Sequence, residues 1–455
     1  MVSGIILKNF KSFSRPGKIS FKPITLIFGN NSSGKSSIIN SILLLRQSLS
    51  PRYLRYDFVS DDKYAQLFPS GELVNLGSYL NFVNGMDEKK DIEITFEIKN
   101  FKVYGLEQIY IKGWHEEWER LAEIMNDILI SKEIYLKFFI SFDESFGVFV
   151  SKYEFGTIGD GKIIEYIYDR NGNYNAIPEL KHFFWTRFDN FLKKKGLRKH
   201  ELKIAKSGNE PFGSVFNAEN LATIYPSGCL PYCVGVSEDI FGCGFKNRVV
   251  SNILGWKKYA EKKFVDPAMY LIFASMEIAK FLNGVVHIGP FRNHPKRFYL
   301  NKKEKYEHND YGLEWLCNTK NSDYVDKLNQ FLKKASIGYR MEIERVNVGV
   351  EEQIIPYCKN ISTGVKTPIA DVGYGLSQVM PVVAASMAPG GCAIIQQPEL
   401  HLHPAAQADL GDLFIDGKKK KSFIIETHSE HLILRLLRRI RETSNKRLPA
   451  GVSPL

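Results

Sequence analysis

The sequence predicts an α/β fold, made of a mixed sheet with flanking helices and interrupted by an inserted α+β region. An apolar run at 24–28 is followed by a glycine-rich loop and a periodic apolar run from residue 38, which is the order of a strand, a loop and a helix. Between 92 and 168, apolar and polar residues alternate in several runs, as they do in half-buried strands. Short apolar runs at 393–395 and 422–426 indicate further buried strands.

The glycine-rich loop, FGNNSSGKSS at 28–37, fits the pattern G-x-x-x-x-G-K-[ST]. In such a loop the backbone N–H groups turn inward around phosphate oxygens, and the start of the following helix adds partial positive charge. We expect Lys35 to reach the β- and γ-phosphates and the Ser36 hydroxyl to bind Mg²⁺. The loop therefore predicts a site for ATP with Mg²⁺. The residues expected to hold the nucleotide are Gly29, Asn30, Asn31, Ser32, Ser33, Gly34, Lys35, Ser36 and Ser37.

The other elements follow from periodicity and turn residues. Strands are expected at 2–8 and 18–21, ahead of the glycine-rich loop. The remaining runs predict strands at 92–98, 133–142, 149–155, 163–168, 285–290, 339–348 and 351–358, a hairpin turn at 169–172, and helices at 115–130, 177–195 and 267–282. Segment 91–284 carries no chemical motif and is interpreted as the insertion. Segments 1–90 and 285–455 are then the two halves of one nucleotide-binding domain.

Composition bounds the possible partners of the chain. The formal net charge is +11 over 455 residues and the pI is about 9.1. This excess of positive charge favours a polyanionic partner such as nucleic acid. The alternative explanation of the charge is a generally Lys-rich surface with no such partner. Six cysteines in a chain of this length favour a reducing compartment over a disulfide framework. The sequence has neither a signal peptide nor an apolar run long enough for a membrane helix. We therefore expect a cytoplasmic protein with no membrane partner.

A later stretch at 373–378, GYGLSQ, opens a predicted helix. A serine at a helix start, preceded by glycines, can present its hydroxyl and backbone N–H groups to an anion. Gly375 and Ser377 are therefore candidates for binding a phosphate. The alternative is that Ser377 only caps the helix.

Two further stretches complete the pattern. The strand ending at 396 runs into QPELHLHP at 397–404, and the strand ending at 426 runs into THS at 427–429. His401 and His403 lie two residues apart, which does not place both side chains on one face of a helix. We interpret these two histidines as structural or interface residues rather than as a metal pair.

In this order, the glycine-rich loop, GYGLSQ, QPELHLHP and THS resemble the ABC-class ATPases of the SMC, RecF and OLD type, whose fold is a P-loop ABC-type head. The opening stretch LKNFKSF at 7–13 is also typical of them. The likeness is strongest to compact bacterial ATPases of antiphage defence modules, including OLD-like proteins and the ATPase subunits of Septu or PARIS. The resemblance covers about residues 1–80 and 285–440 and leaves the inserted region out.

The resemblance implies a homodimer or higher homo-oligomer in which two heads pair head-to-tail around two ATP molecules. The glycine-rich loop of one subunit would hold the phosphates, and Ser377 of the other would close over the γ-phosphate. His428 would sense that phosphate. Because the chain ends soon after a basic helix at 430–441, a Toprim nuclease domain has no room, and a separately encoded nuclease or other effector is expected as partner.

Two other functions stay open at this point. One is a RecF-like repair ATPase that binds DNA directly. The other is a scaffold that binds ATP without turning it over.

The end of the strand at residue 396 departs from the family pattern. The resemblance implies an acid at this position that orders Mg²⁺, and often a second acid after it that activates water. This chain has Gln396 and Gln397 there, and loss of a general base costs about 10²- to 10⁴-fold in rate. Either the chain is a slow or inactive hydrolase that works by binding ATP, or Gln396 is an engineered replacement of a Glu that traps the ATP state. The matching shapes of Gln and Glu favour the second explanation.

Glu399 could act as a base or at the subunit interface. The catalytic candidates are therefore Gln396, Gln397, Glu399 and His428, with Ser36 and Gln396 at the metal.

Overall fold

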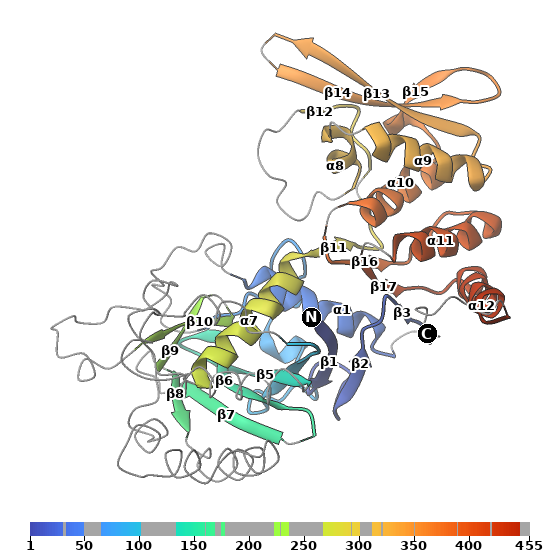
Figure 1. The fold of residues 1–455 in the computed structure, drawn as a ribbon. Helices are drawn as coiled ribbons and strands as arrows, with labels where there is room; N and C mark the ends of the chain where they lie inside the picture. The colour runs from blue at the N-terminus through green and yellow to red at the C-terminus, as the bar shows by residue number, and fades with distance from the viewer. Residues whose placement is uncertain are drawn as a thin grey trace, which may run out of the picture. The chain divides into compact units, whose positions relative to one another are not determined.

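A computed structural model describes most of the chain as two compact units (Figure 1). The first unit consists of Met1–Ser20 and Asn40–Leu282, and the second of Phe21–Ile39 and Asn283–Leu455. The described residues are 1–30, 33–49, 65–101, 133–159, 161–168, 174–177, 223–227, 229–235, 267–292, 294–300, 312–319, 322–349, 351–388, 390–418 and 421–445. The helix expected at 115–130, the turn expected at 169–172 and nearly all of the helix expected at 177–195 lie outside them.

The described part of the first unit is built on one sheet of nine antiparallel strands, in the order β10-β9-β8-β7-β6-β5-β4-β1-β2. The strands are β1 (Val2–Lys8), β2 (Gly17–Ser20), β4 (Ile92–Ile98), β5 (Ile134–Asp143), β6 (Gly147–Thr157), β7 (Gly161–Tyr168), β8 (Tyr174–Ile177), β9 (Thr223–Ser227) and β10 (Leu230–Gly235). A short 3-10 helix, η2 (Tyr79–Asn81), and the helix α7 (Pro267–Asn283) belong to the same part of the chain.

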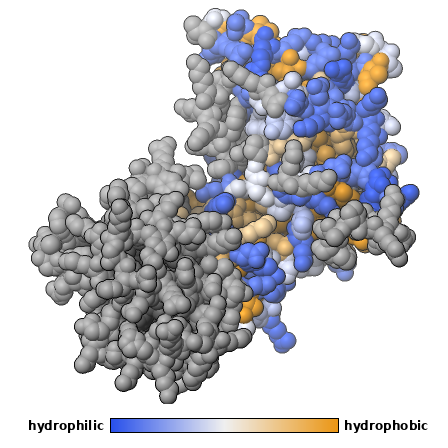
Figure 2. Space-filling model, in the orientation of Figure 1, coloured by the Kyte–Doolittle hydropathy of each residue, from blue (hydrophilic) through white to orange (hydrophobic). Residues whose placement is uncertain are grey.

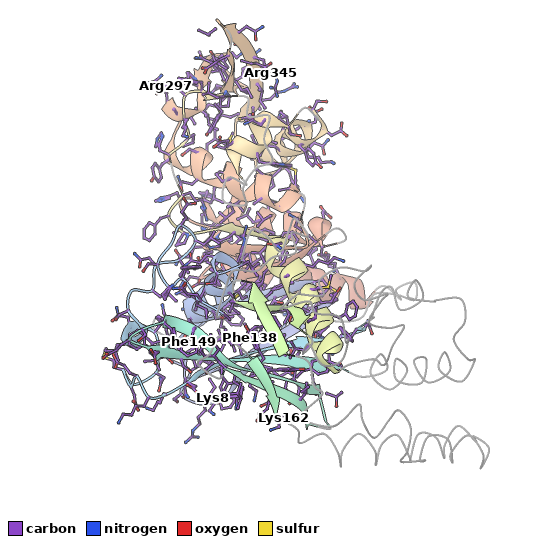
Figure 3. The ribbon with its side chains drawn as sticks, turned by 90° about the vertical axis from the view of Figure 1, so that its left-hand side faces the viewer. Lys8, Phe138, Phe149, Lys162, Arg297 and Arg345 are labelled. Atoms are coloured by element: carbon purple, nitrogen blue, oxygen red, sulfur yellow. The ribbon has the colours of Figure 1, made fainter. Side chains whose placement is uncertain are left out.

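Alternation along the strands produces the core of this unit. In β5, every second residue from Ile134 to Ile140 is fully buried, as the period of two in a strand requires. Phe138 of β5 lies edge-on to Phe96 of β4, and Phe281 of α7 contacts the same Phe96 ring, each with ring centroids 6.2 Å apart. Figure 3 shows Phe138 on this sheet. The helix α7 therefore packs on the sheet through aromatic side chains.

The division into units differs from the three segments expected from the sequence. Strand β4 pairs with β1 in antiparallel register, with Ile5 opposite Phe96. The strands assigned to the insertion thus continue the sheet that β1 and β2 begin. The glycine-rich loop instead lies in the second unit, together with residues 283–455.

The second unit holds a parallel sheet of four strands in the order β11-β16-β17-β3. The strands are β11 (Val285–Ile288), β16 (Cys392–Gln396), β17 (Ser422–Glu426) and β3 (Ile24–Ile27), and the helices of this unit are α8 (Leu313–Asn318), α9 (Ser322–Lys334), α10 (Tyr374–Met387), α11 (Pro404–Gly417) and α12 (Glu430–Asn445). The helix α1 (Lys35–Gln47) begins in this unit and continues into the first unit from residue 40. All five residues of β16 are buried, which explains why it is a short, unbroken apolar run rather than an alternating one. In register, Gln396 lies beside Glu426, and Glu426 beside Ile27. The carboxyl ends of three strands therefore meet at one edge, which is where α/β sheets bind ligands.

A small antiparallel sheet completes the second unit. It consists of β12 (Tyr299–Leu300), β13 (Tyr339–Val348), β14 (Glu351–Asn360) and β15 (Lys366–Pro368), followed by the 3-10 helix η5 (Ile369–Asp371). The expected pairing of β13 with β14 is confirmed. On the face drawn in Figure 2, hydrophilic residues dominate this part of the second unit, and hydrophobic residues form separate patches.

The predicted α/β class is confirmed, with the glycine-rich loop between strand β3 and helix α1. The described strands form three sheets. In the described residues, parallel pairing is confined to the sheet of β3, β11, β16 and β17, and the other sheets are antiparallel. None of the helices in the described ranges combines the length and apolar character that crossing a bilayer requires.

A buried carboxylate fastens the outer helices of the second unit. Asp412 of α11 is 4% exposed, and its oxygens accept hydrogen bonds from Lys334 of α9 and from Arg435 and Arg439 of α12, at 2.7 to 3.1 Å. Burial alone would raise the pKa of Asp412, but the hydrogen bonds from Arg439, Arg435 and Lys334 hold it well below its usual range. One carboxylate thus links three helices.

We predict that Asp412→Asn lowers the free energy of unfolding by about 2 kcal/mol, because three cations lose their buried partner. The native pKa lies below the unfolded value of about 3.9, so this stabilisation is present above about pH 4 and is lost as the pH falls toward the native pKa. Denaturant unfolding at pH 7 and pH 3 measures both effects. The matched control is Asp416→Asn, which changes an exposed residue of the same helix and should have almost no effect. Equal unfolding midpoints for the two variants would contradict this role.

Candidate nucleotide-binding site

Two backbone carbonyl groups of the glycine-rich loop hold the amine of Lys35. Gly29 and Gly34 have φ values of 146° and 89°, which favour glycine over other residues. Lys35, the first residue of α1, donates from Nζ to the carbonyl oxygens of Gly29 at 2.9 Å and Asn30 at 2.7 Å. A phosphate in the loop would replace these carbonyls as partners of the amine. Asn31 and Ser32, which were expected to contact the nucleotide, lie outside the described residues.

A carboxylate that sequence analysis missed lies next to the loop. Ser36 Oγ donates to Glu426 Oε1 at 2.9 Å, and Gln396 Nε2 donates to Glu426 Oε2 at 2.7 Å. Glu426 is the last residue of β17 and is 4% exposed. The signal in the sequence was an acid at the end of an apolar strand, directly before THS. Glu426 therefore links the two expected metal residues, Ser36 and Gln396. It belongs neither to the glycine-rich loop nor to the QPELHLHP stretch.

Gln396 uses both ends of its amide. While Nε2 donates to Glu426, Oε1 accepts from Nε2 of His287, a residue of β11, at 3.0 Å. An amide fits this position because it accepts on one side and donates on the other. A carboxylate at 396 would bring two acids to hydrogen-bonding distance and would require a proton or a cation between them.

The turn after β16 holds the turn after β17. Both oxygens of Glu399 are occupied: Oε2 accepts from Thr427 Oγ1 at 2.9 Å, and Oε1 accepts from the backbone N–H of His428 at 2.7 Å. Glu399 and Thr427 are buried, while the side chain of His428 is exposed. Ser429 Oγ accepts from the N–H of Leu432 at 3.1 Å, which fixes the start of α12. Glu399 therefore positions an exposed His428 between two buried neighbours.

The start of α10 differs from the expected phosphate-binding arrangement. Ser377 is fully buried, and its Oγ donates to the carbonyl of Tyr374 at 2.9 Å, one turn earlier in the helix. A Cβ atom at Gly375 would lie 2.6 Å from the carbonyl oxygen of His401, so glycine is needed there for a close backbone approach. Tyr374 is 54% exposed, and its ring lies edge-on to that of His401 at 4.9 Å. The hydroxyl of Ser377 is thus directed into its own helix.

Arg292 connects this helix to the end of β16. Its guanidinium donates to the carbonyl oxygens of Gln396 at 3.0 Å, Gln397 at 2.7 Å and Gln378 at 3.3 Å. Gln397 has a φ of 46°, a left-handed conformation that costs energy in a residue with a side chain. Burial lowers the pKa of Arg292 to about 10, and Glu399 opposes that shift. Sequence analysis did not select Arg292 as a site residue, because contacts to backbone carbonyls leave no pattern in the sequence.

The two histidines of QPELHLHP are turn residues. His403 Nδ1 accepts from the N–H of Ala405 at 3.3 Å and caps α11. In the described ranges, no group of three or more His, Cys, Asp or Glu side chains is placed to hold a metal ion. Mg²⁺ requires less, since it keeps several waters and uses one or two carboxylates together with substrate phosphates. Ser36 and Glu426 fit that smaller requirement.

Two domain families match this chain. The AAA ATPase domain matches residues 291–433, and the AAA domain matches residues 5–207. The chain is also 28% identical to the Chromosome partition protein Smc of Halothermothrix orenii over 132 residues, which are 28% of this chain and 11% of that protein. The aligned region is therefore a small part of that relative.

Solved structures with some likeness include SMC heads. The SMC head domain from Thermotoga maritima has a TM-score of 0.35 and 11% identity, with 95% of this chain and 91% of that chain covered. The Smc head domain with a coiled coil and joint from Pyrococcus yayanosii has a TM-score of 0.37 and 11% identity, with 95% and 93% covered. TM-scores in this range carry no weight on their own.

We predict that Arg292→Lys lowers the free energy of unfolding by about 2 kcal/mol, because one ammonium cannot bridge three carbonyl oxygens. Denaturant unfolding followed by circular dichroism measures this change. Arg297→Lys is the control, since the bidentate pair of Arg297 with Asp371 is exposed and should contribute about 0.5 kcal/mol or less. Figure 3 labels Arg297. Equal losses in the two variants would contradict a bridging role for Arg292.

The AAA matches at both ends of the chain, together with the glycine-rich loop and its buried partners, support an ATPase.

Proposed function

We propose that the chain binds ATP with Mg²⁺ in the glycine-rich loop and hydrolyses it slowly. The observation that carries the proposal is the contact of Ser36 with a buried carboxylate, one residue from a lysine amine that donates to two backbone carbonyl oxygens of the loop. This combination supplies a cation for the phosphates and oxygen ligands for Mg²⁺. A glycine turn with a purely structural role needs neither a buried amine nor a buried acid.

Slow turnover follows from the groups around the loop. Positions 396 and 397 carry amides, which cannot accept a proton from water at neutral pH. Both oxygens of Glu399 already bind the turn at Thr427 and His428. Glu399 is therefore better placed to position His428 than to act as a base. Binding and charge neutralisation remain, and they stabilise the transition state, but the loss of a general base alone costs about 10²- to 10⁴-fold in rate.

We also propose that two ATP-bound heads pair, as the resemblance to SMC and RecF proteins implies. The exposed side chain of His428 supports this, because a phosphate sensor must be reachable. Ser377 is buried in its own helix, so a direct contact of its hydroxyl with a partner's phosphate requires that the first turn of α10 rearrange. Gly375 and its neighbours then supply backbone N–H groups to the same phosphate.

We predict that Lys35→Ala weakens ATP binding by about tenfold or more, since a charged hydrogen-bonding group is lost, and that it abolishes an ATP-dependent increase in mass. Titration with a fluorescent ATP analogue and light scattering with and without ATP measure these effects. Lys22→Ala removes an exposed lysine just before β3 and should behave like the unaltered chain. Unchanged affinity in Lys35→Ala would exclude nucleotide binding by this loop.

For the biological role, we propose that the ATP-bound dimer is a sensor or scaffold that controls a separate effector, such as a nuclease, in bacterial antiphage defence. The support is the order of motifs shared with the ATPase subunits of such modules. The net charge of +11 supports a second candidate, a RecF-like ATPase that binds DNA directly. A scaffold that binds ATP without turnover is the third.

We predict that the chain alone leaves phage plating unchanged in a bacterial host, and that plating falls when its effector is produced with it, because the effector acts on the phage. Plaque counts measure the outcome, with Lys35→Ala as the nucleotide-free control. Full protection by the chain alone, without a co-purifying partner, would refute control of a separate effector. Binding to DNA that weakens steeply with salt would favour the RecF-like role.

A further inference from the structure

We propose that Glu426 is the carboxylate that orders Mg²⁺ at this site, in place of the acid that is missing at Gln396. The inference rests on the proposed binding of ATP and names the residue that would complete its metal site. No sequence pattern assigns a role to this position, which lies on β17 rather than on β16.

The spacing between Ser36 and Glu426 suits a shared Mg²⁺ ion. Mg²⁺ binds oxygen at about 2.0–2.1 Å in an octahedron, so two adjacent ligands lie about 3.0 Å apart. Ser36 Oγ and Glu426 Oε1 are 2.9 Å apart. The hydroxyl of the glycine-rich loop and the carboxylate are therefore already at the spacing of neighbouring ligands, and neither needs to move far to share one cation.

Gln396 orients the carboxylate of Glu426 through its second oxygen. Glu426 Oε2 accepts from Gln396 Nε2 at 2.7 Å, and Gln396 is in turn held by His287. Metal-binding carboxylates are commonly oriented by such a hydrogen bond. Gln396 is thus a positioning residue, and its amide directs one oxygen of Glu426 toward Ser36.

The charge of the pair formed by residues 396 and 426 also suits one Mg²⁺ ion. One carboxylate is sufficient for Mg²⁺ when the nucleotide phosphates complete the coordination. With an acid at both 396 and 426, two negative charges would meet at hydrogen-bonding distance, and the site would be unfavourable before a cation binds. With Gln396, the pair carries a single charge and is fully hydrogen-bonded without metal.

Glu399, the acid in the turn after β16, is committed elsewhere. Both of its oxygens bind the turn at Thr427 and His428. Of the contacts among the described residues, that of Glu426 is the one that brings an acid to Ser36.

The test compares affinities for a fluorescent ATP analogue in Mg²⁺ and in EDTA. For the unaltered chain we expect Mg²⁺ to tighten binding by about tenfold or more, and for Glu426→Gln we expect the two affinities to agree within about threefold. Glu430→Gln removes an exposed acid four residues later and should retain the full Mg²⁺ effect. Melting temperatures establish that each variant is folded, and Gln at 426 can still accept from Gln396.

A charge exchange strengthens the test. Gln396→Glu combined with Glu426→Gln returns the carboxylate to β16 and keeps one acid and one amide in the pair. We expect this double variant to recover most of the Mg²⁺ effect that Glu426→Gln loses. Recovery would show that the Mg²⁺ effect needs a carboxylate at position 396 or 426. It would exclude the explanation that Glu426 only stabilises the fold.

Separate outcomes distinguish this inference from the proposed function. If the unaltered chain binds no nucleotide in either solution, the proposed function fails. If it binds with a Mg²⁺ effect that Glu426→Gln retains, ATP binding stands and the assignment of Glu426 is overturned.

Discussion

The contact of Glu426 with Ser36 and Gln396 is the interaction on which the candidate site depends. It joins the start of α1 to the ends of β16 and β17 through one buried carboxylate. A buried acid is stable only when its oxygens are hydrogen-bonded or paired with a cation, and here both oxygens have partners. The strands of the parallel sheet supply this geometry, because their carboxyl ends meet at the same edge.

Two further contacts tie the surrounding turns to this centre. Arg292 holds the backbone at the end of β16 against α10, and Glu399 holds the turn that carries His428. Both use charged side chains on backbone groups, which fixes the position of the chain and leaves His428 exposed. A bound phosphate would draw Lys35 away from its two carbonyl partners. The loop could then change while Arg292 and Glu399 hold the turns after β16 and β17 in place. This arrangement is consistent with the proposed function, in which the chain binds ATP and turns it over slowly.

Much of the second unit could be predicted from the sequence, because buried parallel strands are short apolar runs and the glycine-rich loop has a fixed spacing. The role of Glu426 could not, since it arises from strand register that brings residue 426 beside residue 396. The boundary expected at residue 91 also failed to match the compact units, because β4 completes the sheet begun by β1. The burial of Ser377 could not be predicted either. Its hydroxyl donates a hydrogen bond to the carbonyl of Tyr374 in the same helix, and no sequence motif reveals this contact.

The central claim concerns where a metal ion binds, so the most direct measurement locates that ion. Crystals of the chain with a non-hydrolysable ATP analogue and Mn²⁺ in place of Mg²⁺ would show the metal by its anomalous scattering. The account predicts one strong peak at about 2.2 Å from both Ser36 Oγ and a Glu426 oxygen, with Gln396 bonded to the other oxygen (a distance slightly above that for Mg²⁺). A metal bound to the phosphates and Ser36 while Glu426 remains outside its coordination sphere would contradict it.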